Sequence, residues 1–219
     1  MYKSLLLLVF PLMVTNLAGA QKAPSVQIRF LAQIAPDGMG SVVMVAGEQT
    51  GDPFTLPTQN LSEHLEPPAR TFELRDEEGK RLLGTVALPE GGKDFIVLLV
   101  VGEGPGYTPI VIDSSDADFR VGDVYAYNSS SQTIQGKVGS QGFTIPPRKS
   151  HIIKPAGAIE GNYYNVAFGL RNEADRKVRV ISTSRWPVTK VRRSYLFFFD
   201  APQNNTVTYR AVDEYVQGR

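Results

Sequence analysis

The stretch TFELRDEEGKRLLGTVALP, residues 71–89, decides the fold of this chain. On both sides of its polar, turn-forming residues 75–80, apolar side chains alternate with others, which is typical of a β-hairpin. A second stretch, AFGLRNEADRKVRVISTSRWP at residues 167–187, repeats the motif Phe-x-Leu-Arg-(Asp/Asn)-Glu 96 positions later. The chain therefore contains the same strand-turn-strand unit twice.

The rest of the chain after residue 20 also follows a pattern of short strands. Runs rich in Val, Ile, Phe, Tyr and Thr are separated by Gly, Pro, Asn and Asp every ~8–12 residues, as in sandwiches and barrels. Strands are predicted at residues 26–33, 41–46, 71–75, 82–88, 95–101, 108–113, 121–128, 134–138, 151–154, 163–171, 178–184, 194–200 and 206–215. The expected fold class is all-β, with two tandem immunoglobulin-like β-sandwich domains.

Four pairs of segments correspond, in the same order, between the two halves of the chain. They are 40–42 with 122–124, 54–57 with 143–146, 72–77 with 168–173, and 95–99 with 195–199. Offsets that only grow along the chain are expected when a domain is duplicated and its loops then gain residues. We predict an internal duplication with domains at 21–115 and 116–219. Two unrelated sandwiches with similar strands are the alternative.

Two of the predicted strands, 95–101 and 195–199, consist entirely of apolar and aromatic residues. A strand of this kind is buried on both faces. We therefore expect each to be a central strand, covered on one face by the partner sheet of its own domain and on the other by a contact between domains. The alternative is an exposed hydrophobic patch, but such a patch would favour aggregation.

The N-terminus has the pattern of a secretory signal peptide over residues 1–20. Lys3 precedes an apolar run at 5–14, and Ala18-Gly19-Ala20 supplies small residues for cleavage. Ala20 stands where a lipoprotein would need Cys, and no later apolar run reaches the ~18 residues of a membrane-spanning helix. The chain has no cysteine, which favours a bacterial protein exported to the periplasm or the exterior. We expect neither a lipid anchor nor a membrane span.

The net charge of +1 hides an asymmetry between the halves. Residues 21–115 carry 7 Lys and Arg against 13 Asp and Glu, a net charge of −6, whereas 116–219 carry 15 against 9, a net charge of +6. Either the two halves dock on each other, which we favour, or the basic half faces an anionic partner.

Few residues are suited to catalysis. The chain has two histidines, His64 and His151, and no His-x-His pattern or cysteine, so zinc and copper would lack their usual ligands. Residues 139–142, Gly-Ser-Gln-Gly, are one residue short of a nucleophile elbow and lack the following helix. No phosphate loop or dinucleotide fingerprint occurs. We predict a protein that is not an enzyme; a hydrolase acting on envelope carbohydrate is the alternative.

A group of carboxylates lies where the duplication places the domain junction. Clustered carboxylate and hydroxyl oxygens suit Ca²⁺, which takes six to eight hard oxygen ligands. The candidate calcium ligands are Asp113, Asp116, Asp118 and Asp123. A solvated polar linker is the favoured alternative, and no other cofactor is expected.

A basic segment with an interleaved tryptophan is the candidate binding site. Sugar rings stack on aromatic faces, and guanidinium groups bind anions in a forked geometry. The candidate residues are Arg176, Arg179, Arg185, Trp186, Lys190, Arg192 and Arg193. The predicted ligand is an anionic polysaccharide or an envelope protein. Export makes nucleic acid an unsuitable ligand, and the oligomeric state stays open. Surface charge that is merely solvated, or that docks on the acidic half, is the alternative.

Three segments, Phe54-Thr55-Leu56-Pro57, 183–187 and 209–214, give the chain a resemblance to uncharacterised exported β-sandwich proteins of environmental Gram-negative bacteria. That resemblance implies no activity. Two sandwich domains behind a signal peptide also resemble periplasmic pilus chaperones, in which a basic side chain anchors a subunit carboxylate and an edge strand is added to the subunit. This resemblance would give those parts to Arg29 and residues 107–113. The predicted function is an exported, non-catalytic binding or structural module of the cell envelope.

Overall fold

The computed structural model describes residues 25–102, 104–172, 177–201 and 206–216, so the predicted signal peptide lies outside the described residues. Within these ranges the protein is all-β, with fifteen strands in four sheets and no helix. The strands are β1 (Gln27–Ala32), β2 (Val42–Ala46), β3 (Gln49–Thr50), β4 (Thr71–Asp76), β5 (Leu82–Ala87), β6 (Asp94–Val101), β7 (Tyr107–Asp113), β8 (Val124–Asn128), β9 (Ile134–Val138), β10 (Gln141–Ile145), β11 (Ser150–Ile153), β12 (Tyr163–Arg171), β13 (Val178–Pro187), β14 (Arg192–Asp200) and β15 (Val207–Tyr215).

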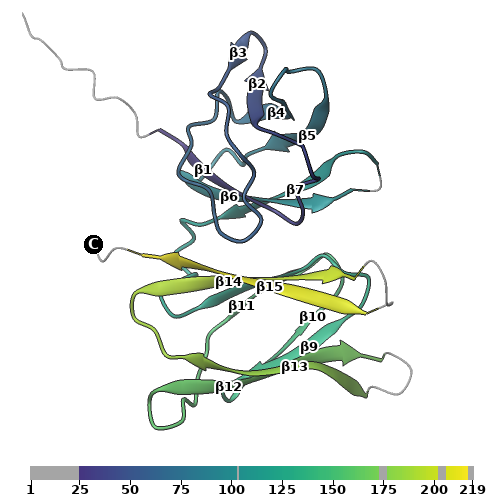
Figure 1. Ribbon diagram of the computed structural model, residues 1–219. Helices are drawn as coiled ribbons and strands as arrows, with labels where there is room; N and C mark the ends of the chain where they lie inside the picture. Colours follow the sequence, from purple (N-terminus) through teal and green to yellow (C-terminus); the bar gives the residue numbers. More distant parts are fainter. Residues whose placement is uncertain (1–24, 103, 173–176, 202–205, 217–219) are drawn as a thin grey trace, which may run out of the picture.

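The four sheets lie on top of one another as four layers (Figure 1). In the N-terminal domain, sheets β3-β2-β4-β5 and β1-β6-β7 enclose the first core. In the C-terminal domain, sheets β11-β8-β14-β15 and β10-β9-β12-β13 enclose the second core. The two middle sheets, one from each domain, pack against each other through a third apolar cluster. The predicted all-β fold of two sandwiches is confirmed.

The central strands β6 and β14 are buried on both faces, as predicted. Along β6, alternate side chains point into the first core and into the contact between domains. Along β14, Leu196 and Phe198 belong to the second core, whereas Tyr195, Phe197 and Phe199 belong to the contact between domains. Each strand is thus one wall of two apolar layers at once.

The two domains share most of their strand order, although the C-terminal inner sheet has an additional edge strand, β11. In each, a central strand runs parallel to the first strand of its sheet and antiparallel to the last: β6 between β1 and β7, and β14 between β8 and β15. The outer sheets β3-β2-β4-β5 and β10-β9-β12-β13 also correspond, strand for strand. A duplication would produce this correspondence, and the duplication itself stays a prediction.

Two of the predicted segment matches are wrong. Residues 40–42 lead into β2, whereas 122–124 lead into β8, which occupies the place of β1. The match of Phe95 with Tyr195 is displaced by one residue, because Phe95 faces its own core and Tyr195 faces the other domain. A shift of one residue turns every side chain of a strand to the opposite face, so Tyr195 is not the equivalent of Phe95.

Two strands, β3 and β10, were not among those predicted. Strand β10 follows β9 after the two-residue turn Gly139-Ser140, and Val138 pairs with Gln141. Gly139 has a φ of 61°, and a Cβ on it would lie 1.9 Å from the carbonyl oxygen of Ala156. Only glycine fits this turn. The glycines of this segment therefore belong to a tight hairpin rather than to a longer loop.

The contact between domains is mainly apolar. Its buried members include Leu31, Ile96 and Leu98 from the N-terminal domain and Phe197 and Phe199 from the C-terminal domain. The two halves are docked, but not through their opposite net charges. The ion pair that crosses the contact joins Arg29 of the acidic half to Glu214 of the basic half, the reverse of what the net charges suggest.

We expect Phe197→Ala to lower the free energy of unfolding by ~3–5 kcal/mol, because it opens a cavity at a fully buried position between the domains. Val191→Ala, at a side chain with 57% exposure, is the matched control and should change stability by less than ~0.5 kcal/mol. Urea denaturation of both variants measures this. Equal effects of the two substitutions would show that the contact between domains contributes little.

Candidate functional site

A buried polar cluster lies within the apolar contact between domains. We name it the interdomain cluster: Arg29, Arg193, Tyr195 and Glu214, each less than 10% exposed. Glu214 is at its centre. Its Oε1 lies 2.5 Å from Nη2 of Arg29, and its Oε2 accepts hydrogen bonds from Nε of Arg193 at 2.5 Å and from the Tyr195 hydroxyl at 2.7 Å.

Strand alternation places these polar groups at the contact. On β1, Ile28 and Phe30 point into the first core, so Arg29 points to the other domain. Arg193 and Glu214 are opposite each other on β14 and β15. The guanidinium of Arg193 also lies 4.6 Å from the ring centre of Phe119 and donates to the Phe119 carbonyl oxygen at 3.2 Å.

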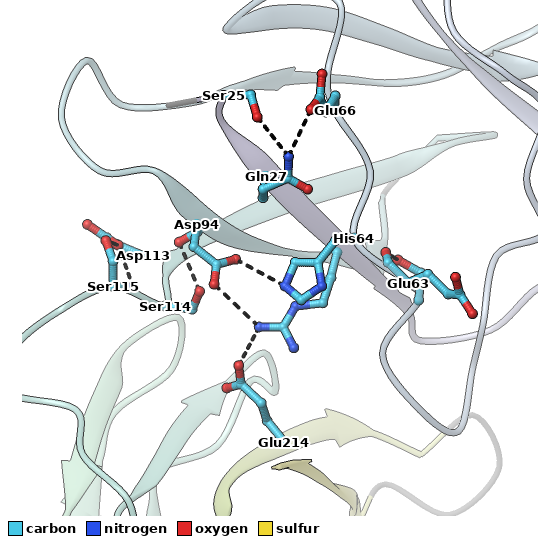
Figure 2. A network of polar contacts seen from close by, with 12 residues as sticks. Ser25, Gln27, Glu63, His64, Glu66, Asp94, Asp113, Ser114, Ser115 and Glu214 are labelled. Atoms are coloured by element: carbon cyan, nitrogen blue, oxygen red, sulfur yellow. Dashed lines mark hydrogen bonds and ion pairs between the residues drawn. The ribbon is translucent and has the colours of Figure 1, made fainter. Parts of the chain in front are cut away.

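The cluster extends to the surface through Asp94 and His64 of the N-terminal domain. Arg29 Nη2 lies 3.9 Å from Asp94 Oδ2, and His64 Nε2 lies 3.9 Å from Asp94 Oδ1. Figure 2 shows Glu214 reaching toward this group from the opposite domain. His64 is half exposed, and at 3.9 Å neither contact of Asp94 is a hydrogen bond. These ionisable side chains form a chain from the half-exposed His64 to Glu214.

Burial and charge act on Glu214 in opposite directions. Burial by itself raises the pKa of this carboxyl, but the hydrogen bond from Arg193, the charge of Arg29 and the hydrogen bond from Tyr195 outweigh it, so the pKa is lowered. Burial and the Glu214 charge raise the pKa of the Tyr195 hydroxyl. Glu214 is therefore a carboxylate and Tyr195 a neutral donor at neutral pH. Because its four side chains are buried and in contact with one another, the cluster stabilises the contact between domains.

In this cluster, two residues with predicted binding roles contact groups of their own chain. Arg193 was predicted to bind an external ligand, but its guanidinium is buried against Phe119 and Glu214. Arg29, the basic anchor suggested by the resemblance to pilus chaperones, is occupied by Glu214 of its own chain. Strand β7, which that resemblance selects, is an edge strand of its sheet and carries Pro109, which has no N–H for strand addition.

A second site is a cavity of about 160 Å³ at one end of the C-terminal sandwich, which we name the end cavity. It opens between the two sheets beyond the second core. Its aromatic wall is the cross-strand pair Tyr164 and Trp186, on β12 and β13. Its other lining residues include Pro155, Pro187, Thr189, Arg192, Ser194, Ala211 and Asp213.

The end cavity exists because the inner faces of β14 and β15 change character where the core ends. Leu196 fills the core, and the preceding positions on the same face are Ser194 and Arg192. On β15, Ala211 is opposite Leu196, and Asp213 is opposite Ser194. Polar side chains thus continue the core-facing row, so the sandwich is open at this end.

The polar groups of the end cavity converge on Asp213. Its Oδ2 lies 2.8 Å from Nη1 of Arg192, and its Oδ1 accepts a hydrogen bond from the Ser194 hydroxyl at 2.6 Å. Asp213 is more than a third exposed, so its carboxylate is in reach of a ligand. An aromatic wall opposite a carboxylate, a guanidinium and a hydroxyl can bind a ring that has one apolar face and polar substituents.

The structure brings two of the seven predicted binding residues, Trp186 and Arg192, into the end cavity and separates the others. Arg185 lies on the outer face of the sheet, beside Lys137 and 4.9 Å above the Tyr163 ring. Of the remaining positions, Arg179 is near the start of β13, Lys190 is exposed on the β13–β14 turn, Arg193 is between the domains, and Arg176 lies outside the described residues. The described members of the predicted site therefore lie on more than one surface.

The predicted calcium ligands serve the chain around the domain junction. Asp113 accepts hydrogen bonds from the backbone and side chain of Ser115, and Asp116 accepts one from the backbone N–H of Asp118. Asp123 accepts one from the N–H of Arg120 and lies 3.3 Å from Nζ of Lys154. Among the residues that the structure describes, no group of three or more His, Asp or Glu side chains is arranged to hold a metal ion. The carboxylates of Asp113, Asp116 and Asp123 thus act as acceptors for nearby groups of the chain, and calcium binding stays a prediction.

Comparison with known proteins adds no assignment. A scan against protein-family models matches no family, and a search of curated proteins finds no similar protein. The described residues contain no helix of the length and apolarity that crossing a membrane requires.

We expect Glu214→Gln to lower the free energy of unfolding by ~3–5 kcal/mol, because two buried guanidinium groups lose their charged partner. Asp213→Asn is the matched control, because Asp213 immediately precedes Glu214 on β15 but its side chain lines the open end cavity. Its loss of a partly exposed ion pair should cost only ~0–1 kcal/mol. If both variants unfold at the same urea concentration, the interdomain cluster is not a stabilising element.

The stability of the protein should also depend on pH through Glu214. Because its folded-state pKa is lowered, its contribution is fully present above the unfolded value of about 4.3 and is lost as the pH falls through the folded-state pKa. Urea unfolding from neutral pH to about pH 3 should show a smaller acid loss in Glu214→Gln than in the natural sequence. Parallel profiles would contradict the assignment.

Proposed function

We propose that this protein is an exported, non-catalytic binding module of the bacterial cell envelope, and that its ligand is a glycan whose ring enters the end cavity. The observation that carries the proposal is the pairing of the Tyr164–Trp186 wall with the Arg192–Asp213–Ser194 group across one cavity. An enclosed cavity of ~150 Å³ holds a benzene molecule. The end cavity therefore has room for a single six-membered ring.

The chemistry of a sugar ring matches both walls. One face of a pyranose presents C–H groups, which stack on an aromatic side chain such as Trp186. Its hydroxyl groups donate to a carboxylate such as Asp213 and accept from a guanidinium such as that of Arg192. The pairing of Arg192 with Asp213 leaves the cavity itself close to neutral.

A positively charged side chain at the rim of the end cavity could bind an acidic substituent of the glycan. Lys190 is exposed on the turn between β13 and β14, next to Thr189, which lines the cavity. A sugar ring in the cavity would place its substituents toward this turn. An anionic polysaccharide would therefore make its charge contact with the exposed Lys190 and not with the buried Arg193.

The end cavity has too few carboxyl groups for glycoside hydrolysis among its described lining residues, which favours binding over hydrolysis. Glycoside hydrolysis uses two of them on opposite sides of the scissile bond, ~5–10 Å apart. Asp213 is the one carboxylate among the described residues that line the end cavity, and Arg192 and Ser194 hold it. Export to the envelope is inferred from the signal-peptide pattern of residues 1–20 and the absence of cysteine.

Trp186 is the single tryptophan of the chain, so its fluorescence reports on the end cavity directly. We expect acidic envelope polysaccharides, added as size-fractionated oligosaccharides, to change this fluorescence saturably. Trp186→Ala should weaken their binding, measured by calorimetry, about tenfold or more, because the stacking face is lost.

Arg185→Ala is the matched control for that experiment. Arg185 is the neighbour of Trp186 on β13, but its side chain lies on the outer face of the sheet. It should leave the affinity unchanged. Loss of binding in Arg185→Ala with full binding in Trp186→Ala would place the ligand on the outer face and refute the end cavity as its site.

A further inference from the structure

The two outermost faces of the four-layer stack carry charges of opposite sign. We name the outer side of sheet β3-β2-β4-β5 the acidic face; it includes Glu73, Glu77 and Glu78 together with Arg75. The strands β2 to β5 and their loops, residues 41–90, carry 9 Asp and Glu against 4 Lys and Arg. This end of the molecule therefore attracts cations.

We name the outer side of sheet β10-β9-β12-β13 the basic face. Its hollow is lined by Lys137 and Arg185, with Asn165 and Thr183 between them. The strands β9, β10, β12 and β13 contain four Lys and Arg and no Asp or Glu. The two faces are at opposite ends of the stack (Figure 1).

The contact between domains does not neutralise this asymmetry. Its crossing ion pair withdraws one cation, Arg29, from the acidic half and one anion, Glu214, from the basic half. Without the buried Arg29 the acidic half keeps a net charge of −7 (6 − 13), and without the buried Glu214 and Arg193 the basic half keeps +6 (14 − 8). A molecule with ends of opposite charge attracts further copies of itself end to end.

Each face also exposes large apolar side chains beside its charges. Leu82 is opposite Arg75 on the acidic face and is 46% exposed. Val180 is opposite Gly169 on the basic face and is 58% exposed. Exposed apolar groups next to complementary charges are what a contact between proteins needs.

We propose that the acidic face of one copy binds the basic face of the next, so that the protein assembles head to tail. The interior of the molecule already packs the corresponding middle sheets of its two domains face to face. The proposed contact would do the same with the corresponding outer sheets. Because the two faces differ, the contact is heterologous and generates a linear chain of copies unless the chain closes into a ring.

Sedimentation velocity of the purified chain over a range of concentrations tests this assembly. At about 0.02 M salt the mean mass should rise with concentration to at least twice that of the monomer, and at about 0.5 M salt it should return toward the monomer. A monomer at every concentration in low salt would overturn the proposal.

Charge reversal tests which faces are in contact. Glu77→Lys with Glu78→Lys reverses the charge of two side chains on the acidic face, and Lys137→Glu with Arg185→Glu reverses the two that line the hollow of the basic face. Each double variant then meets like charges at the proposed contact, so each alone should be monomeric. Mixed in equal amounts, the two should assemble again, because each supplies the face that the other lacks. Both substituted pairs are exposed, so folding should be retained.

Two controls make the outcome specific. Arg120→Glu with Lys149→Glu changes the net charge equally at exposed positions on other surfaces and should leave the assembly intact. Trp186→Ala should also leave it intact, since the assembly is independent of the end cavity. A mixture that stays monomeric would overturn the proposal. If the natural sequence is monomeric and the variant with Lys137→Glu and Arg185→Glu loses polysaccharide binding, the proposal is also overturned, and the basic face is then a polysaccharide site.

Discussion

The contact between the two middle sheets is the constraint on which the rest of the structure depends. Strands β6 and β14 are apolar on both faces, so each needs a partner layer on either side. A single sandwich supplies one such layer. Docking the domains supplies the other, and it turns two sandwiches into a stack of four sheets (Figure 1). The outer faces that remain carry charged side chains, and the end cavity lies at one end of the C-terminal sandwich.

Within this apolar contact the interdomain cluster fixes one arrangement of the domains. Apolar surfaces slide on each other at little cost, because their attraction has no direction. Glu214, in contrast, is satisfied only where Arg29, Arg193 and Tyr195 meet it from two domains. Any other docking would leave buried charges without partners, which is strongly unfavourable. Arg210 adds to this by donating to the carbonyl oxygens of Ala32 and Gln33 across the contact.

Strand positions and the double burial of residues 95–101 and 195–199 follow from sequence, because strand alternation and turn residues are local properties. The binding residues follow less well. Successive side chains of a strand point to opposite faces of the sheet, so the neighbours Arg185 and Trp186 on β13 lie on different faces. Residues that are close in the sequence, such as those of 185–193, are therefore not all close in space. Asp213, Ser194 and Tyr164 were missed because they come from separate strands. The row Arg192, Ser194, Leu196, Phe198 was a usable signal, since its polar members continue a core-facing side.

The central claim is that the four sheets form one unit through the contact between domains. Equilibrium urea unfolding, followed by both Trp186 fluorescence and far-ultraviolet circular dichroism, tests it most directly, because the fluorescence reports the C-terminal domain alone and the dichroism reports both. We predict that the two curves coincide in a single transition. A fluorescence transition separated from a second transition seen only by dichroism would show that the domains unfold independently and would contradict the claim.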